Sequence, residues 1–410
     1  MSQRAAACKR VVVFLPQAYR GGTLDMVKLL AKMLKFGSQL AGRNLDIVFA
    51  YPDSPIYSPK DFADLYQLGI KTRPFYWRFV TRAQLADVQK MTGYSTPLKG
   101  DRYSIPTDDA NNFLDCDFWF VASDRFDEPL APLRPYCVFA HDYLQRYFPQ
   151  SLGDYYENGF IQTARNSIAV LANTPHTIED IVQYVGIDRR KTILVPHLAE
   201  LEGARDDMSS FVEKGNYFIW TTNAGGHKNQ LLTLHALARY YEINRGTLDC
   251  HITGVESSLF NPKSTQDSEP RPHIRAVRDY LSERPQLAER IVFHGDLPYQ
   301  QYLNVISHAR FLLHNVVMDN GTLCAVEAAY HRTPVLSSNY PPMRYISQRY
   351  GLNATFFDPN DPAELSEKLA WMEANWRAQQ ELLPDVEHLE KFSWKALAPE
   401  FWRQISTIIG

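Results

Sequence analysis

The N-terminal part of the sequence lacks a long hydrophobic run. The basic start MSQRAAACKR leads into a short apolar run that ends at Pro16, which indicates a first β-strand and not a signal peptide or a membrane span. The five cysteines are scattered, without CxxC or Cys/His spacing, which argues against a disulfide framework and a zinc site. These absences predict a cytoplasmic protein whose thiols are reduced.

An excess of charge and a dinucleotide fingerprint are also lacking. The net charge of -3 gives no field that would attract nucleic acid. Gly21 and Gly22 follow the first apolar run, but they are not part of GxGxxG, and no acidic residue stands at the spacing of a ribose-binding dinucleotide site. A nicotinamide-dependent dehydrogenase is therefore disfavoured. The length of 410 residues, 45% of them apolar, is sufficient for two domains.

Short apolar runs alternate with helical patterns through both halves of the chain. This alternation predicts an α/β protein with two doubly wound parallel sheets, each covered by helices on both faces. The expected strands lie at 11–15, 46–50, 118–122, 137–140, 168–172 and 193–196, and then at 217–221, 249–254, 290–293, 309–313, 334–337 and 354–357. The predicted domains are 1–205 and 206–390, with a loop insertion at 257–271 and a last apolar helix at 391–410 that packs on the first domain.

Unusual residues follow four of the expected strands. Ligands of doubly wound sheets bind at the carboxyl ends of the strands, so chemistry is expected in these turns. The turns contain Gly21-Gly22, His141-Asp142, the TNAGGHKN stretch at 222–229, and the stretch DNGTLCAVEAAYHRTPVLSS at 319–338. They are spread over both halves of the chain, as a cleft between two domains requires.

The 319–338 stretch predicts a turn, a helix and a buried strand. Asp319, Asn320, Gly321 and Thr322 form a turn that opens a helix at about 323–330, because Asn, Asp and Thr cap backbone donors and Gly tolerates unusual dihedrals. The first amides of such a helix make an anion site. Glu327, one turn further in, either takes part in this site or faces water or a cation.

These segments together resemble the GT-B glycosyltransferases of the large retaining family four, which use nucleotide sugars. The resemblance rests on Gly21-Gly22, on FAHDYLQRYFP with His141-Asp142, on VLANTPHTIEDIVQYVGI, on the HKN at 227–229, on FHGDLPYQQYLNVISHARFLLHN, and on the 319–338 stretch, which aligns with the E-x7-E signature of the family. The last is the most specific, and all six occur in family order.

The resemblance implies a division of labour between the domains. The N-terminal domain would hold the acceptor and the C-terminal domain the nucleotide sugar, with Lys228 neutralising the diphosphate and His141 contacting the donor sugar. Other donor contacts would come from Gly21, Gly22, Asn223, Asn320, Gly321, Thr322, Leu323 and Glu327. Asp319 and the turn amides would meet the sugar and the diphosphate, and Glu327 would accept hydrogen bonds from the ribose hydroxyls.

Two positions depart from the family pattern. The first carboxylate of the signature is Glu in the family and Asp319 here, which is one methylene shorter. An Arg of the family, five residues before the lysine, is replaced by Asn223, which carries no charge. Lys228 would then carry more of the diphosphate charge. No DxD motif follows an expected strand, so no metal and no other cofactor are expected.

Several residues keep a structural alternative. His141 could be a loop histidine, Lys228 a first-turn lysine, and Gly21-Gly22 a turn. The segment KTRPFYWRFVTR at 71–82 predicts either a strand followed by a helix start or a surface that docks on an anionic membrane or a lipid-linked acceptor, since it interleaves four cations with four aromatic residues.

The sequence therefore predicts a cytoplasmic, metal-independent, retaining glycosyltransferase. It would move a hexose such as mannose from a GDP- or UDP-linked sugar to a hydroxyl of a growing surface glycan or lipid-linked acceptor, with peripheral membrane contact through 71–82. The alternative is a GT-B-shaped protein that binds nucleotide sugar or glycan without turnover, which Asp319 and Asn223 make plausible.

Overall fold

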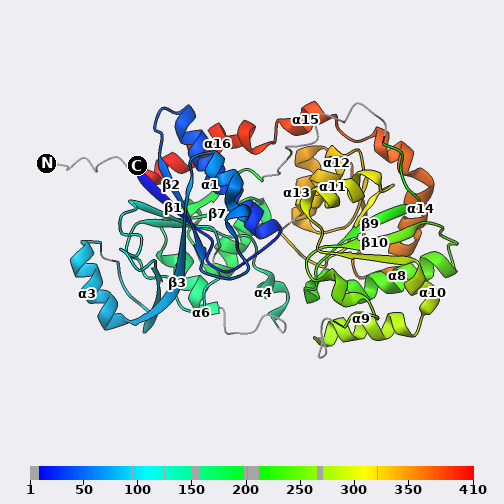
Figure 1. The fold of residues 1–410 in the computed structure, drawn as a ribbon, viewed down its shortest axis with the longest axis horizontal. Coiled ribbons are helices and arrows are strands. Elements are labelled where there is room, and N and C mark those ends of the chain that lie inside the picture. Colours follow the sequence, from blue (N-terminus) through cyan, green and yellow to red (C-terminus); the bar gives the residue numbers. More distant parts are fainter. Residues whose placement is uncertain are drawn as a thin grey trace. The chain divides into compact units, whose positions relative to one another are not determined.

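A computed structural model describes residues 9–94, 96–123, 125–149, 157–197, 201, 212–265, 271–320 and 322–410. The chain divides into two compact units. Unit 1 comprises Met1–Leu198 and Ser393–Gly410, and unit 2 comprises Ala199–Phe392 (Figure 1). The domain boundary predicted near residue 205 lies outside the described residues, and each unit is described by itself.

Unit 1 contains an eight-stranded sheet in the order β4-β3-β2-β1-β5-β6-β7-β8. All neighbouring strands are parallel except β3 and β4. The strands are β1 Arg10–Phe14, β2 Asp46–Pro52, β3 Lys71–Thr81, β4 Arg102–Thr107, β5 Phe118–Val121, β6 Tyr136–Phe139, β7 Ala169–Ala172 and β8 Thr192–Leu194. β4 was not predicted, because its sequence RYSIPT holds a proline, which is rare inside strands but is tolerated on an edge strand such as this one.

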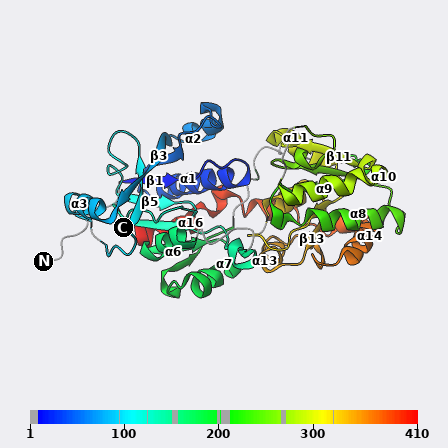
Figure 2. The same ribbon diagram turned by 90° about the horizontal axis from the view of Figure 1, so that it is seen from below.

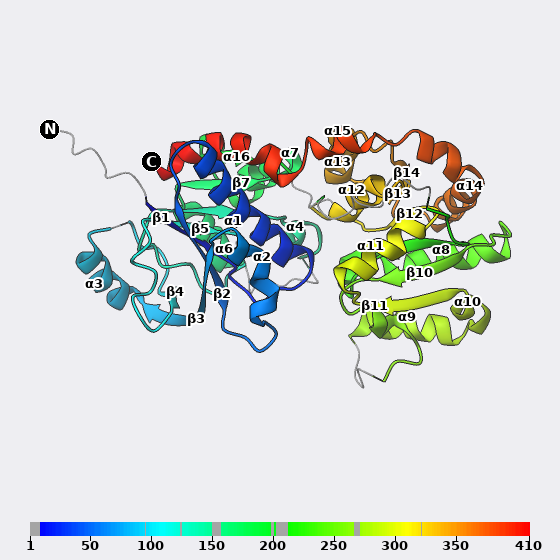
Figure 3. The ribbon, with the colours of Figure 1, turned by 45° about the horizontal axis from the view of Figure 1, so that its top comes forward.

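The helices of unit 1 cover both faces of this sheet. They are α1 Gly22–Leu40, η1 Pro59–Phe62, α2 Ala63–Gln67, α3 Arg82–Thr92, α4 Leu144–Tyr147, α6 Glu157–Asn166, α7 Pro175–Asp180, η3 Ile181–Val185, η4 Arg189–Lys191 and α16 Trp394–Ile409. Side chains on the two faces of the sheet pack in different layers. Val170 lies in a core that α6 and α7 complete, whereas Phe120 contacts Phe401 of α16. β3, β4 and α3 lie together at one edge of the sheet (Figure 3).

The C-terminal helix α16 packs along α1 (Figure 1). Their contact is close at Gly37, where a Cβ would lie 2.7 Å from the Ala398 carbonyl oxygen and 2.8 Å from the Cβ of Trp402. Phe36 also meets Trp394 edge to face, with ring centroids 5.6 Å apart. The last residues of the chain therefore fold as part of unit 1, because a glycine lets the two helices approach.

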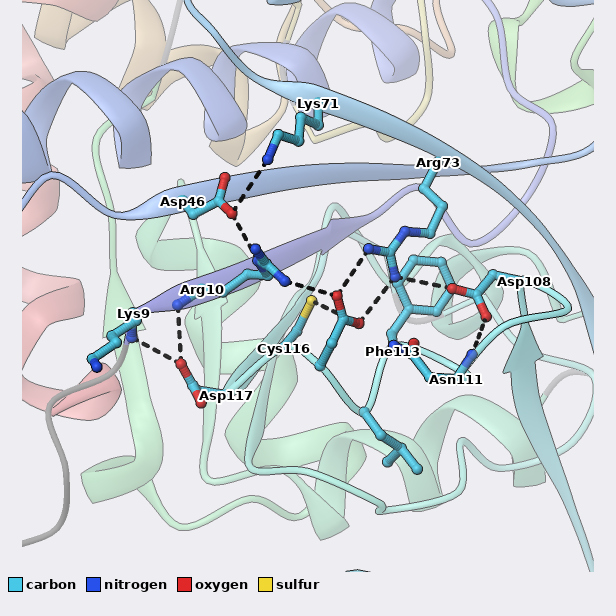
Figure 4. Close-up of polar contacts among 12 residues, drawn as sticks. Lys9, Arg10, Asp46, Lys71, Arg73, Asp108, Asn111, Phe113, Cys116 and Asp117 are labelled. Atoms are coloured by element: carbon cyan, nitrogen blue, oxygen red, sulfur yellow. Dashed lines mark hydrogen bonds and ion pairs between the residues drawn. The ribbon is translucent and has the colours of Figure 1, made fainter.

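Arginines and aspartates form an ion-pair network at the amino-terminal edge of the unit 1 sheet (Figure 4). Arg10 bonds Asp46 at 2.7 Å and Asp115 at 2.9 Å, and Arg73 bonds Asp108 and Asp115, each at 2.9 Å. The Arg73 hydrogen bonds, aided by Arg10 and opposed by burial, lower the pKa of Asp115 to about 2. This edge is opposite to the carboxyl ends of the strands, so the network ties strands together rather than forming the expected site.

Unit 2 contains a six-stranded parallel sheet in the order β11-β10-β9-β12-β13-β14. The strands are β9 Tyr217–Thr221, β10 Asp249–Thr253, β11 Ile291–Gly295, β12 Leu312–His314, β13 Val335–Ser338 and β14 Thr355–Phe357. This is the Rossmann order, in which connections leave the central pair β9 and β12 in opposite directions. The predicted strands of this half are all present; β9 has the predicted bounds, and the ends of the others are shifted by at most three residues.

The helices of unit 2 form two layers. They are η5 Gly226–Lys228, α8 Gln230–Glu242, η6 Ser257–Phe260, α9 Pro272–Ser282, α10 Pro285–Glu289, α11 Tyr299–His308, α12 Leu323–Tyr330, α13 Pro341–Tyr350, α14 Pro362–Glu381 and α15 Val386–Glu390. Within the predicted 257–271 loop, η6 forms and 266–270 lie outside the described residues.

Alternation along β9 shows how the two layers are built. Phe218 and Trp220 pack in one core with α8, α9 and α14, of which α8 and α14 lie side by side (Figure 2), whereas Ile219 packs in the other core with α11, α12 and α13. Both faces of a parallel sheet are thus covered, which explains its continuous apolar runs.

Candidate functional site

Two turns of unit 2 meet at the carboxyl ends of the adjacent strands β9 and β12. The backbone N–H of Val317 donates to the carbonyl of His227 at 3.3 Å. Asn229, which caps α8 with φ of 55°, donates from its side-chain amide to the carbonyl of Pro359 at 2.6 Å and to Asn315 Oδ1 at 3.4 Å. The turn at 222–229 and the turn at 315–322 are therefore held together, as their positions after parallel neighbours require.

Lys228 and Asp319 form an ion pair between these turns. The Lys228 ammonium donates to Asp319 Oδ2, and the two side chains are only 14% and 16% exposed. The other oxygen, Oδ1, accepts the backbone N–H of Asn320 at 2.8 Å. The two residues predicted to be catalytic in this half, which stand 91 positions apart in the sequence, are thus direct partners.

The pair fixes the charge of the site. Burial would raise the pKa of Asp319, but the charge of Lys228, together with His227 and the Lys228 hydrogen bond, lowers it to about 2. Burial and the neighbouring Lys228 lower the pKa of His314, at the end of β12, to about 3. At neutral pH the site therefore holds an ionised carboxylate, an ammonium and a neutral imidazole.

The start of α12 lacks a side-chain cap among the described residues. Thr322 is the N-cap residue by backbone position, but its hydroxyl instead lies 2.7 Å from the sulfur of Cys324. The amides of Leu323 and its successors thus keep the uncompensated N–H groups of a helix start. Gly321, predicted as a donor contact, lies outside the described residues.

Glu327 lies on α12 and contacts two tyrosines of α11. Its Oε2 accepts the hydroxyl hydrogen of Tyr302 at 2.8 Å, and its Oε1 lies 3.4 Å from the hydroxyl of Tyr299. Glu327 therefore does not simply face water. Neither tyrosine was singled out in the sequence, where they belong to the YQQY run at the helix start and could have been found by their spacing of three residues.

Asn223 folds back on its own turn. Its side-chain oxygen accepts the N–H of Gly225 at 2.9 Å, and Gln230 donates to its carbonyl at 2.8 Å. A Cβ at Gly225 would lie 2.8 Å from the ring of His227 and 2.9 Å from the side chain of Asn223, so a larger residue there would displace both side chains. Asn223 thus shapes the turn that carries Lys228.

In unit 1, His141 follows the carboxyl end of β6. Its Nε2 lies 2.8 Å from the carbonyl of Ala122, which follows the neighbouring strand β5, so Nε2 carries the proton and donates it. Burial lowers the pKa of His141, although the charge of Asp142 opposes this effect. The lowered pKa keeps the ring neutral at neutral pH. Asp142 itself accepts from Arg125 at 2.6 Å. Arg125 was not predicted, because no motif in the sequence marks it as a partner of Asp142.

The glycine pair follows β1 at the same edge of the sheet. Gly21 has φ of 62° and is the N-cap residue of α1, a conformation that disfavours any side chain. At Gly22, in contrast, a Cβ would meet nothing within 4 Å. The turn requires Gly21, whereas no contact in the described chain requires Gly22.

The described residues contain no group of three or more His, Cys, Asp or Glu side chains arranged to hold a metal ion. Among them there is also no helix with the length and apolar character needed to cross a membrane.

We compared the chain with proteins of known sequence and structure. No curated protein sequence matches the chain. The structure of Anabaena Alr3699/HepE in complex with UDP aligns with 97% of this chain and 100% of that one, with a TM-score of 0.64 and 13% identity. The structure of WaaG, a glycosyltransferase involved in lipopolysaccharide biosynthesis, aligns with 97% of this chain and 99% of that one, with a TM-score of 0.61 and 13% identity.

A glycosyltransferase from Rickettsia africae aligns similarly, with a TM-score of 0.63, 10% identity and coverage of 98% of this chain and 99% of that one. At identities this low, the structural similarity establishes the fold alone. It confirms the prediction of two Rossmann-like sheets in a GT-B fold. Residues 206–385, which lie within unit 2 and contain Lys228, Asp319 and Glu327, match the family of glycosyl transferases group 1.

Proposed function

We propose that this chain is a retaining glycosyltransferase that moves a hexose, such as mannose, from a GDP- or UDP-linked sugar to a hydroxyl of a surface glycan or lipid-linked acceptor. The observation that carries the proposal is the Lys228–Asp319 pair beside the uncapped start of α12. Support also comes from the family match over 206–385, and from solved structures of similar fold that contain UDP or UDP-glucose or act in lipopolysaccharide synthesis.

The diphosphate of the donor would bind at the amides that begin α12, close to Lys228. A helix start and an ammonium group both favour anions, and the charge that develops on the departing diphosphate strengthens both interactions. Asp319 holds Lys228 in place and presents its remaining acceptor capacity to a sugar hydroxyl. These residues perform the electrostatic work without a metal ion, and EDTA should leave activity intact.

His141 would contact the donor sugar as a hydrogen-bond acceptor. Its Nε2–H is used by Ala122, and the ring is neutral, so Nδ1 offers a lone pair to a hydroxyl. Gly22 would allow the backbone before α1 to approach a ligand closely.

A screen of nucleotide sugars tests the function most directly. Purified protein is heated with GDP-, UDP- and dTDP-linked sugars, because a ligand that binds only the folded state raises the unfolding temperature. The stabilising donor is then incubated with glycan extracts. We expect transfer with retention of configuration by wild-type protein and almost none by Lys228→Ala. Binding without any transfer or donor hydrolysis would contradict the proposal and leave a binding protein.

Membrane contact through 71–82 is a separate part of the proposal. Arg73 is partly buried in the ion-pair network described above, and Lys71, although exposed, lies 3.8 Å from Asp46 of that network. Tyr76, Arg78 and Phe79 are exposed and lie outside the network. The contact would therefore use the 76–79 part of β3. Co-sedimentation with phosphatidylserine vesicles should fall in an Arg78→Glu, Phe79→Ser variant, whereas Lys90→Glu, an exposed change on α3, should have a smaller effect.

A further inference from the structure

The two tyrosine hydroxyls near Glu327 make unequal contacts. Tyr302 is partly buried and donates to Oε2 at a normal distance of 2.8 Å, whereas the Tyr299 hydroxyl lies 3.4 Å from Oε1 and its residue is 38% exposed. A separation of 3.4 Å is at the long end for an O–H···O bond, so the second contact is weak. Of the two tyrosine contacts, the one that Tyr302 makes with Oε2 is therefore the stronger.

We infer that Tyr302 positions Glu327 for a ribose diol, and that Tyr299 occupies the place that a ribose hydroxyl takes when nucleotide binds. This inference rests on the proposed function, since it names how the chain would recognise the ribose of a nucleoside diphosphate.

The chemistry of the carboxylate supports this division. An ionised carboxylate has about four lone-pair sites, of which Tyr302 uses one on Oε2. Burial and the neighbouring charge of Glu327 raise the pKa of Tyr302 well above its ordinary value. The hydroxyl therefore keeps its proton, which it donates to the Glu327 carboxylate. A vicinal diol would donate two hydrogen bonds to the carboxylate, one of them at Oε1 in place of the long Tyr299 contact.

The helices fix the positions of these groups. Tyr299 and Tyr302 are three residues apart, on one side of α11, and α11 packs on α12 within the core shared with α13. A carboxylate on a helix surface otherwise samples several rotamers, and ordering it opposes binding. The Tyr302 hydroxyl removes that freedom before the nucleotide arrives, so it acts through Glu327 and is a positioning residue.

The test compares ribose with 2′-deoxyribose in nucleotide affinity. Calorimetry gives the dissociation constants of UDP and dUDP, and of GDP and dGDP, for wild type and three Tyr→Phe variants. Tyr217→Phe is the matched control, because its hydroxyl donates to the Val305 carbonyl of the same helix α11 at 2.8 Å, away from Glu327.

We expect the two variants at the Glu327 carboxylate, Tyr302→Phe and Tyr299→Phe, to change ribonucleotide affinity differently. Tyr302→Phe should weaken ribonucleotide binding by roughly two- to tenfold and lower the preference for ribose over deoxyribose by a similar factor, as the loss of one hydrogen bond requires. Tyr299→Phe should leave affinity unchanged or raise it, because a competitor for Oε1 is removed. Tyr217→Phe should leave the preference unchanged.

Three results would overturn the inference while the proposed function stands: an unchanged ribose preference in Tyr302→Phe, an equal loss in Tyr217→Phe, or a larger loss in Tyr299→Phe than in Tyr302→Phe. If wild-type protein binds none of the four nucleotides, the proposed function fails and this inference fails with it. Unfolding temperatures of the variants confirm that each is folded.

Discussion

Units 1 and 2 hold their candidate residues by different means. In unit 2, side chains far apart in the chain contact one another, namely Lys228 with Asp319 and Tyr302 with Glu327. In unit 1, His141 bonds a backbone carbonyl and Gly21 has a backbone conformation that suits glycine. The family match, which covers 206–385, falls within the unit whose site consists of such side-chain pairs.

This difference predicts how each unit responds when one of its candidate side chains is substituted. A charged partner removed from unit 2 leaves the opposite charge half-buried and unpaired, so both chemistry and stability respond. A side chain removed from unit 1 leaves the backbone geometry of the turn in place, so the response is confined to the ligand. The predictions below test that contrast, beginning with the largest effect.

Lys228→Ala should reduce turnover by about 10²-fold or more, the scale of losing one preorganised electrostatic contact. The unfolding temperature should also fall, because Asp319 loses its partner. Steady-state transfer assays and thermal unfolding measure both, with Lys263→Ala, an exposed lysine of the same unit, as the control. Turnover close to that of wild type would return Lys228 to an ordinary first-turn lysine.

Glu327→Gln should weaken the binding of nucleotide and nucleotide sugar alike by roughly 1 to 3 kcal/mol, because the amide keeps the shape but loses charge-assisted hydrogen bonds. Asp319→Asn should lower sugar transfer and leave free nucleotide binding nearly intact. Calorimetry separates the two variants, and equal nucleotide affinity for wild type and Glu327→Gln would contradict the ribose assignment.

The ion pair predicts a pH dependence of stability. The folded pKa of Asp319, about 2, lies below its ordinary value near 3.8, so the pair contributes about 2 kcal/mol that is present above about pH 4 and is lost as pH falls through about 2. The difference in unfolding free energy between wild type and Asp319→Asn should therefore shrink over this range. Denaturant titrations at several pH values measure it, and a constant difference would show that the pair contributes little.

His141→Ala should lower turnover by roughly tenfold and change nucleoside diphosphate affinity little, because its contact would be to the sugar and strengthen in the transition state. This prediction sharpens the contrast, since the proposed function assigns nucleotide binding to unit 2. If affinity falls as far as turnover does, His141 has a structural role.

Gly22→Ala should fold with unchanged or slightly higher stability, since the added methyl meets nothing, yet it should lower turnover several-fold if a ligand approaches that backbone. Gly37→Ala on the same helix is the opposite case: it should cost roughly 1 to 3 kcal/mol of stability, because the methyl would clash with α16. Chemical denaturation and transfer assays distinguish them. Full activity of Gly22→Ala would leave the glycine pair as a turn.

Asp319→Glu makes the smallest change, one methylene. If Asp319 is suited to its donor, the longer side chain should impair transfer, since it must shift the Lys228 contact. If the shorter residue is a tolerated deviation, transfer should be unchanged or improved. Transfer rates at saturating donor decide between these outcomes.

The sequence by itself determined the local elements. Apolar runs bounded by turn residues predicted all six strands of unit 2, and the turn that begins at Asp319 predicted a helix at about 323–330, which agrees with α12. These features depend on neighbours in the chain, through backbone dihedrals and hydrophobic periodicity, so they can be recognised without tertiary structure. For 71–82, the strand-and-helix alternative was confirmed by β3 and α3, while the membrane contact stays a prediction.

Only the tertiary structure decided which side chains meet. Asp319 alone in the sequence is a turn residue, and Tyr302 is one of two tyrosines on α11. The contacts of these residues are with partners 91 and 25 positions away. Such pairs form because parallel strands bring their carboxyl ends to one edge and because α11 packs on α12. The pKa of Asp319 follows from that packing, since burial and a fixed ammonium exist only in the folded chain.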